Sequence, residues 1–244
     1  LSFLASLLVY FVFVAVVARP KLNWPLRQVK KSMTTSQELT DQFKDIVFII
    51  PARKGSKGVP LKNRGLLDQT VKSLPPNLWR NIIVTSDDEW IEEYCAQRQL
   101  TYHARSAELS GDKVDIKSVM QQVIGDCNLD KYQKVIMLYV VWPYRTFDLI
   151  QAALKEYLLS SSRSLLCATP VKSHPYMTFR WVERNRGEPV VKHQLFRRQD
   201  YPECFVINHI VTIFDVGELA SLNEQLYNSH TFFFPVREEL NIDE

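Results

Sequence analysis

Short apolar runs alternate with longer amphipathic stretches along most of the chain. The apolar runs have the length of buried strands and predict strands at 46–50, 82–85, 135–141, 165–171, 205–214 and 232–236. The amphipathic stretches between them predict helices at 88–99, 115–127 and 146–159. Parallel neighbours in a sheet need crossover connections, which helices usually supply. The alternation therefore predicts an α/β fold with a mainly parallel sheet, whose ligands bind beyond the carboxyl ends of the strands.

The first 18 residues differ from the rest, because they contain no charge, no Gly and no Pro. As a helix they would span about 27 Å, slightly less than the ~30 Å hydrocarbon core of a bilayer. We expect a membrane anchor at 1–18. A cleaved signal peptide is the alternative, since the small-residue pattern at Val16–Ala18 suits a signal peptidase. Residues 19–44 turn polar and predict a stem, which leaves 45–244 as one globular domain.

Charge and composition narrow the function classes. The formal net charge is +3, and no long Lys/Arg run or nucleic-acid motif is present, so nucleic acid is not an expected partner. The four cysteines are widely spaced among apolar neighbours and are interpreted as buried thiols: Cys95, Cys127, Cys167 and Cys204. The five histidines are interpreted as structural, and no general base can be identified from the sequence.

The loop after the first predicted strand carries the clearest chemical signal. Gly55 and Gly58 follow that strand closely, in a chain with only seven glycines. Glycine lets the backbone turn tightly and bring N–H groups to phosphate oxygens, while Arg53, Lys57 and Lys62 add positive charge. The spacing is neither a Walker A loop nor a dinucleotide fingerprint. Taken alone the loop would be a solvated basic turn; in this context it favours a triphosphate ligand.

The same segment resembles the signature of the CMP-sugar synthetases, particularly the N-acylneuraminate cytidylyltransferases. The family pattern is a strand followed by A-R-x-x-S-K-G-x-P-x-K-N, which residues 52–63 match. The resemblance implies a three-layer Rossmann-like nucleotidyltransferase fold with a small dimerisation segment. The sequence H-P-Y at 174–176 resembles the start of that segment, so the resemblance also implies a homodimer. It also implies residues that hold the triphosphate and act at its α-phosphate: Arg53, Lys57, Lys62 and Asn63.

Further matches follow in the family's order. V-T-S-D at 84–87 resembles a strand end that accepts the cytosine, and R-S-A-E-L at 105–109 resembles a loop near the nucleotide. R-Q-D-Y-P at 198–202, with Asn208 downstream, resembles R-Q-x-x-P and a later N-G that line the acidic-sugar pocket. The nucleotide-binding residues implied are Ala52, Ser56, Gly58, Thr85, Ser86, Asp87 and Arg105. The sugar-binding residues implied are Tyr139, Arg198, Gln199 and Asn208.

The chain departs from the family pattern in the shorter stretch between Asn63 and Thr85 and at two of the expected binding sites. The family's D-I-D, whose carboxylates hold Mg²⁺, is N-I-D here, so we expect a magnesium site with Asp243 and the amide Asn241. The family's L-Q-P-T-S-P-L-R is L-Y-V-V-W-P-Y-R at 138–145, which places Tyr139 where the family's Gln contacts the sugar. Tyr139 and Trp142 either form an aromatic wall for an acyl-sugar or pack at a strand end.

The resemblance implies transfer of CMP from CTP to the anomeric hydroxyl of sialic acid, with release of pyrophosphate. Two alternatives stay open: a different 2-keto acid sugar such as KDO, and a catalytically impaired, membrane-anchored homologue that acts as a binding or regulatory subunit. The anchor is unusual for the family, and the chain most resembles its insect Golgi forms. We expect a Golgi or secretory-pathway membrane location with a lumenal catalytic domain, although the basic residues after the span would favour a cytosolic one.

Overall fold

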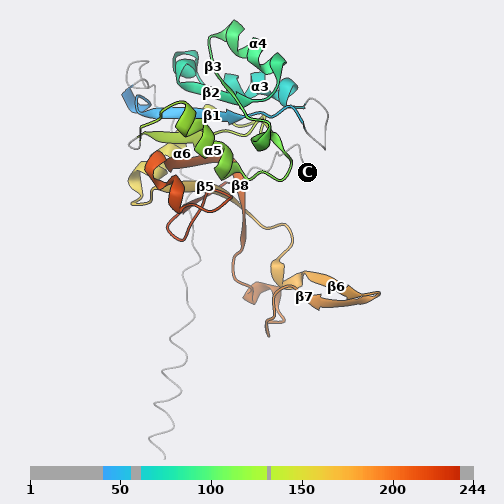
Figure 1. Ribbon diagram of the computed structural model, residues 1–244. Coiled ribbons are helices and arrows are strands. Elements are labelled where there is room, and N and C mark those ends of the chain that lie inside the picture. The colour runs from blue at the N-terminus through green and yellow to red at the C-terminus, as the bar shows by residue number, and fades with distance from the viewer. Residues whose placement is uncertain (1–40, 56–61, 131–132, 237–244) are drawn as a thin grey trace, which may run out of the picture. The chain divides into compact units, whose positions relative to one another are not determined.

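The computed structural model describes residues 41–55, 62–130 and 133–236 (Figure 1). The expected membrane segment at 1–18 and most of the expected stem at 19–44 lie outside these residues. The same holds for Ser56, Lys57 and Gly58 of the basic loop and for the expected metal residues Asn241 and Asp243. Among the helices that are described, none is both long enough and apolar enough to cross a membrane.

Within the described residues, the main sheet has seven strands in the order β3-β2-β1-β4-β8-β5-β9 (Figure 1). All neighbouring strands in it are parallel, except where β8 pairs antiparallel with β4 and β5. The mainly parallel sheet that the sequence predicts is therefore confirmed. The strands are β1 (Ile46–Pro51), β2 (Ile82–Ser86), β3 (Thr101–Ala104), β4 (Lys134–Met137), β5 (Ser164–Pro170), β8 (Phe205–Asp215) and β9 (Phe232–Pro235).

The sheet is covered on both faces, because its central strand is apolar on both sides. In β1, Phe48 and Ile50 join one buried cluster and Val47 and Ile49 join another, as the two-residue period of a strand requires. The first cluster includes side chains of α3 (Lys62–Lys72), α4 (Glu89–Arg98) and α6 (Phe147–Leu159). The second includes α5 (Ile116–Asp126) and the 3-10 helix η5 (Val216–Ser221). The result is the expected three-layer α/β arrangement.

Three of the helices were predicted from the sequence, and each begins after a capping side chain. Asp88 accepts a hydrogen bond from the Trp90 N–H, Asp115 from the Ser118 N–H, and Thr146 from the Leu149 N–H. These caps fix where α4, α5 and α6 begin. The predicted helices at 88–99, 115–127 and 146–159 are confirmed to within the capping residues.

In the main sheet and the helices that cover it, three elements differ most from the prediction. Helix α3 was not predicted, because its sequence is polar, contains Gly65 and buries few apolar side chains. Strand β3 was not predicted either, since it lies at the sheet edge and buries one side chain, His103. Strand β4 ends at Met137 instead of the predicted 141, because its partner β8 pairs with it only as far as Thr212.

The packed domain begins earlier than the predicted 45. The ring of Phe43 is fully buried, with its centroid 5.7 Å from those of Phe48 and Phe147. All four cysteines are free thiols. Cys95 and Cys167 are buried as expected, but the prediction is wrong for the two that lie at element boundaries and are partly exposed, Cys127 at the end of α5 and Cys204 before β8.

Residues between β5 and β8 form a separate two-stranded sheet, β6 (Phe179–Glu183) with β7 (Arg186–Pro189) (Figure 1). We call residues 174–204 the hairpin segment. Its aromatic rings pack on one another, with Tyr176 stacked on His193 at 4.3 Å and on the edge of Tyr201. Short 3-10 helices complete the described chain: η1 (Pro76–Asn81), η2 (Glu108–Ser110), η3 (Pro175–Met177) and η4 (Arg198–Asp200).

Candidate active site

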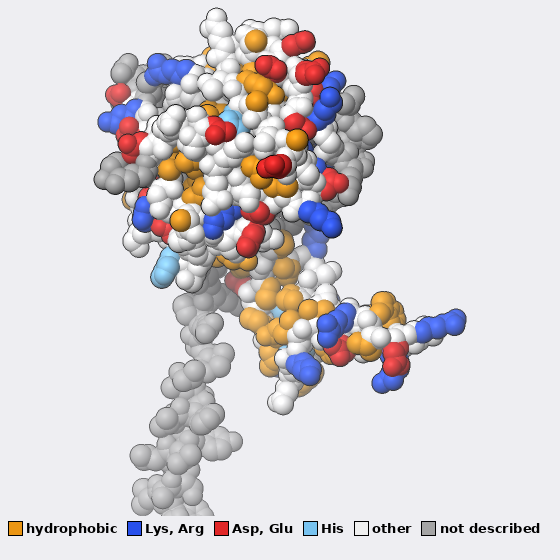
Figure 2. Space-filling model, viewed as in Figure 1, with side chains coloured by type: hydrophobic (Ala, Val, Ile, Leu, Met, Phe, Trp, Pro, Cys, Tyr) orange, Lys and Arg blue, Asp and Glu red, His pale blue; other side chains and the backbone are white. Residues whose placement is uncertain are grey.

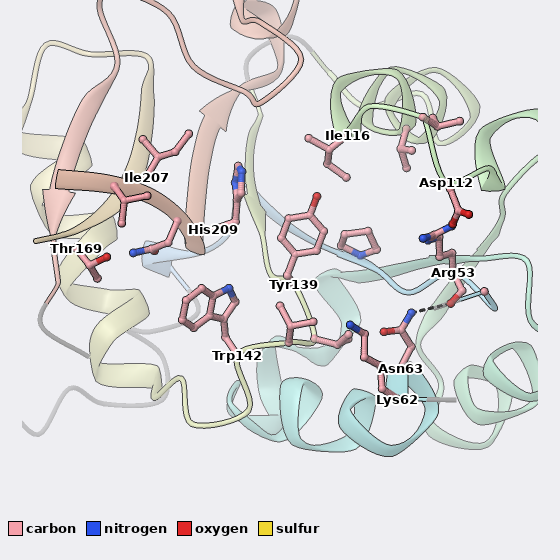
Figure 3. A pocket seen from close by; sticks show the side chains of 18 of the residues that line it. Arg53, Lys62, Asn63, Asp112, Ile116, Tyr139, Trp142, Thr169, Ile207 and His209 are labelled. Carbon is pink, nitrogen blue, oxygen red and sulfur yellow. Dashed lines mark hydrogen bonds and ion pairs between the residues drawn. The ribbon is translucent and has the colours of Figure 1, made fainter. Parts of the chain in front are cut away.

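A cavity of about 710 Å³ opens beyond the carboxyl ends of the parallel strands. Figure 3 shows Arg53, Lys62 and Asn63 at one end of it and Thr169, Ile207 and His209 at the other, with Tyr139 between them. The first group follows β1 and opens α3, and the second comes from β5 and β8. This is where the strand topology predicts a ligand, and the two ends have different chemistry.

The end formed by β1 and α3 suits an anion. Arg53 and Lys62 line it, and the first turn of α3 contains no acidic residue, so the positive end of the helix dipole is not neutralised locally. Asn63 is nearly buried and donates from Nδ2 to the Arg53 carbonyl oxygen at 2.6 Å. That bond ties the start of α3 to the loop after β1. Arg53 in turn donates to Asp112 at 2.6 Å, which holds the guanidinium at the cavity wall.

The strand tips behind this end form a buried scaffold. The Ala52 N–H donates to the Thr85 carbonyl at 3.0 Å, and the Ser86 hydroxyl donates to the Ala52 carbonyl at 2.6 Å. Asp87 accepts from the Lys54 N–H at 2.6 Å. In the described structure these predicted nucleotide-binding residues do not line the cavity. They fix the backbone from which Arg53 projects.

Arg105 brings a buried guanidinium to the cavity wall. Its backbone N–H donates to the Ser86 carbonyl at 2.8 Å and its Nη2 to the Thr85 carbonyl at 3.3 Å. Its Nε is buried and has no hydrogen-bond partner among the described residues. Burial lowers the pKa of Arg105, while the charge of Asp87 opposes that shift. An unpaired, desolvated donor of this kind is suited to an incoming phosphate or sugar oxygen.

The opposite end is more apolar. Tyr139 and Trp142 follow β4, and Ile207, Asn208 and His209 belong to β8. Burial raises the pKa of Tyr139, with Arg105 opposing, so the phenol stays protonated. The ring of Tyr139 meets that of His209 edge-on, with centroids 5.5 Å apart. Tyr139 packs at a strand end and also lines the cavity, so both sequence interpretations of it stay open.

The structure does not bring all the predicted sugar-binding residues together. Tyr139 and Asn208 line the cavity, but Arg198 and Gln199 lie in the exposed η4 of the hairpin segment and do not line it. Residues Ser56, Lys57 and Gly58 of the predicted loop, and the predicted metal ligands Asn241 and Asp243, lie outside the described residues. The predicted set is thus gathered in part around a single cavity.

Two residues of this site were not predicted from the sequence. His209 lines the cavity, although it was interpreted as structural. The signal that could have revealed it is its place directly after Asn208, where the resembled pattern has Gly. Arg145 is buried behind the wall and donates from Nη1 to the carbonyls of Tyr139 at 3.1 Å and Ile210 at 2.8 Å. Its role depends on a fold around it that the sequence pattern does not reveal.

Comparison with known proteins agrees with this geometry. No family model matches the chain. The chain is 24% identical, over 81% of its length, to an N-acylneuraminate cytidylyltransferase from Streptococcus agalactiae, and it spans about half (49%) of that protein. It is 26% identical, over 80% of its length, to a pseudaminic acid cytidylyltransferase from Campylobacter jejuni, of which 88% is covered.

Similarity in structure extends to proteins of still lower identity. One match is the solved structure of a CMP:2-keto-3-deoxy-manno-octonic acid synthetase complexed with CTP. The match covers 79% of the present chain and 90% of the synthetase chain, with a TM-score of 0.53 and 12% sequence identity. That match shows the fold, which is the Rossmann-like nucleotidyltransferase fold expected from the sequence. The chain is thus a distant homologue of N-acylneuraminate and pseudaminic acid cytidylyltransferases, which supports its place among the CMP-sugar synthetases.

Proposed function

We propose that the chain is a nucleotidyltransferase that transfers CMP from CTP to the anomeric hydroxyl of sialic acid and releases pyrophosphate. The observation that carries this proposal is the convergence of Arg53, Lys62, Asn63 and Arg105 at one end of a cavity beyond the carboxyl ends of parallel strands. The distant N-acylneuraminate cytidylyltransferases support the choice of reaction.

The proposed reaction needs positioning and charge neutralisation more than covalent help from the protein. The anomeric oxygen forms a bond to the α-phosphorus of CTP, and the bond from that phosphorus to the bridging oxygen breaks. The departing pyrophosphate takes the electron pair, and the proton of the anomeric hydroxyl passes to solvent water. Arg53 and Lys62 would neutralise the triphosphate, and Asn63 would hold the backbone of Arg53 in place.

The proposed reaction would use a Mg²⁺ ion that is held by only one or two side chains of the protein. No cluster of three His, Cys, Asp or Glu side chains that could hold a metal occurs within the described ranges. Asp112 is a carboxylate at the cavity, and it is paired with Arg53. Because Mg²⁺ commonly uses one or two carboxylates together with substrate phosphates and water, we assign it to Asp243 and Asn241 with the phosphates of CTP. Bound there, Mg²⁺ would neutralise charge on the phosphates.

The test is pyrophosphate release from CTP by the purified protein with Mg²⁺ and sialic acid. Lys62→Ala should lower kcat/KM by at least a hundredfold, because it removes a cation at the triphosphate. Lys72→Ala is the matched control, since Lys72 lies on the same helix, is exposed and pairs with Asp68. Full activity in Lys62→Ala would contradict the role given to that side chain. Calorimetry that shows CTP binding without turnover would favour a silent binding or regulatory subunit.

A second class of acceptor sugar is also a candidate for this chain, because the names of its relatives and of its solved neighbour differ in the sugar acid. The Campylobacter jejuni relative is a pseudaminic acid cytidylyltransferase of similar identity to the chain, and the solved neighbour is a synthetase for 2-keto-3-deoxy-manno-octonic acid. On this second reading, the acceptor of the present chain would be a 2-keto acid sugar other than sialic acid. The same assay with a panel of sialic acid, pseudaminic acid and KDO ranks the acceptors by kcat/KM.

The hairpin segment suits a homodimer, which we propose as the functional assembly. Figure 2 shows hydrophobic side chains gathered on it, and its most exposed apolar side chains include Trp181 at 67% and Phe196 at 86%. Exposed apolar surface of this kind marks interaction sites. Light scattering should give the mass of a dimer for the purified domain and that of a monomer for the double variant Trp181→Ser, Phe196→Ser. An unchanged mass in the variant would place the interface elsewhere.

We further propose that the protein resides in a Golgi or secretory-pathway membrane through residues 1–18, with its catalytic domain lumenal. The apolar composition of that segment supports the membrane part of the proposal. Protease protection of a C-terminally tagged protein in sealed microsomes tests the orientation. Digestion of the tag before detergent is added would place the domain in the cytosol.

A further inference from the structure

A three-residue irregularity in β8, which we call the bulge, shapes the end of the cavity formed by β4, β5 and β8, which we call the acceptor end. Strand β8 pairs with β5 through Thr212 and Leu166, and the pairing resumes at Asn208 and Cys167, so residues 209–211 have no partner on β5. The bulge is held by the Asn208 Oδ1, which accepts from the Ile210 N–H at 3.2 Å, and by Arg145, which donates to the Ile210 carbonyl. Neighbouring side chains in a regular strand point to opposite faces, and a bulge removes that alternation.

Asn208 and His209 both line the cavity although they are adjacent in sequence, as do Val206 and Ile207 before them. Asn208 is 8% exposed, and its Nδ2 is a buried donor without a hydrogen-bond partner in the described part of the chain. A buried donor that stays unpaired is costly, so this amide is poised for an acceptor atom that arrives with a ligand.

His209 supplies a second donor beside it. The Nδ1 of His209 lies 3.0 Å from the Oγ1 of Thr212, a fully buried hydroxyl with no other partner in the ranges described. The hydroxyl proton is satisfied only if it is donated to Nδ1, which leaves the imidazole proton on Nε2. No described group bonds to Nε2, and His209 lines the cavity. Burial lowers the pKa of His209 to about 4, so the ring is neutral near pH 7.

We propose that Nδ2 of Asn208 and Nε2 of His209 together bind the carboxylate of the acceptor sugar, and that His209 is a specificity-determining residue of this protein. Two neighbouring N–H groups match the two oxygens of a carboxylate. Arg198 does not line the cavity of its own protomer, so Asn208 and His209 are the donors that this protomer supplies on β8. Tyr139 packs edge-on against His209 and holds the imidazole ring in its orientation. The proposal rests on the proposed function, because it names how the acceptor of that reaction is recognised.

Steady-state kinetics of paired variants test the role of the donor. His209→Phe keeps a ring against Tyr139 and removes the N–H, so the acceptor KM should rise about tenfold while the CTP KM stays unchanged. His209→Gln keeps an N–H donor, so its acceptor KM should stay closer to that of the wild type. The preference for sialic acid over its methyl ester should fall about tenfold in His209→Phe only. His230→Phe, at an exposed histidine outside the cavity, is the control. A wild-type acceptor KM and ester preference in His209→Phe would overturn the proposal.

A second measurement does not depend on turnover. In protein labelled with ¹⁵N-histidine, the Nε2 signal of His209 is assigned by its loss in His209→Phe. Sialic acid, added with CDP and Mg²⁺, which together cannot release pyrophosphate, should shift that signal, and the methyl ester should shift it less. An unmoved signal refutes the assignment. Absence of pyrophosphate release with every acceptor would instead refute the proposed function, while the spectrum still decides whether His209 meets a sugar acid.

Discussion

Replacing Asp88 tests how the end of the cavity formed by β1 and α3, which we propose as the triphosphate end, is held. The carboxylate of Asp88 caps α4 through the Trp90 N–H at 3.1 Å and receives two hydrogen bonds from Arg64 of α3, each 2.7 Å long. It is 1% exposed, whereas the Arg64 side chain is 29% exposed. Arg64 stands next to Asn63, so this pair anchors the first turn of α3 to the start of α4.

The expected loss of stability follows from these contacts. Removal of a helix cap costs about 1 kcal/mol, and loss of charge-assisted hydrogen bonds to a nearly buried carboxylate adds about 1–2 kcal/mol, so Asp88→Ala should lower the free energy of unfolding by about 2–3 kcal/mol. Asp88→Asn keeps an oxygen for the cap and should lose about 1 kcal/mol. Arg64→Met keeps the cap, so its free energy of unfolding should lie between those of the wild type and Asp88→Ala.

The pH dependence gives a second check on the same pair. The hydrogen bonds from Arg64 hold the pKa of Asp88 below its ordinary value. A carboxylate with a lowered pKa adds stability above its unfolded pKa of about 4, and that stability is lost as the pH falls through the folded value. The difference between wild type and Asp88→Asn should therefore be full at pH 7 and shrink below about pH 4.

Urea unfolding of the three variants at several pH values measures these differences, with m-values compared to confirm that the unfolded state is unchanged. The CTP KM of Arg64→Met should rise severalfold, because Lys62 and Asn63 lose their anchor. Two results would refute the reasoning: Arg64→Met as unstable as Asp88→Ala, which would leave the cap without effect, or a difference between wild type and Asp88→Asn that does not change with pH.

Three further variants separate the site from its scaffold. Asn63→Asp places a carboxylate oxygen against the Arg53 carbonyl, where a donor now lies at 2.6 Å, and should raise the CTP KM at least tenfold in steady-state assays. Arg105→Lys loses the fork that reaches the Thr85 carbonyl and should raise the CTP KM more than the acceptor KM in the same assays. Tyr157→Phe removes a 2.6 Å bond to Asp215 away from the cavity, and urea unfolding should show a loss of about 1 kcal/mol with kcat/KM unchanged.

Local sequence signals were sufficient for six of the seven described strands of the main sheet and for three helices, because these elements carry strong periodicity or side-chain caps. Helix α3 escaped prediction since its buried face is reduced to Leu67 and Val71 beside Asn63 and Thr70. Its identity as a helix matters for function, because it places Lys62 and Asn63 in a first turn instead of a loop. A short helix with so few buried apolar side chains is stabilised by the fold around it, which local periodicity does not report.

The site was predicted unevenly for a related physical reason. Arg53 and Asn63 lie close together in sequence, and their contact is set by a short local segment. Asn208 and His209 depend on a bulge that forms only when β8 meets β5, and the arginine behind it comes from a distant loop. Contacts between distant segments decide that end of the cavity, so a motif could not reveal it.

The two ends of the cavity are built in different ways, which bears on how such a site can take different acceptors. The triphosphate end rests on strand tips joined by backbone hydrogen bonds, where the Ala52 and Thr85 backbones are fixed by the parallel sheet itself. The acceptor end rests on one buried side chain, Arg145, which joins the Tyr139 and Ile210 carbonyls across two elements. Side chains on a bulge can change without disturbing the pairing that holds the triphosphate end. A fixed nucleotide end with an adjustable acceptor end is what relatives with different sugar acids and one nucleotidyltransferase fold would require.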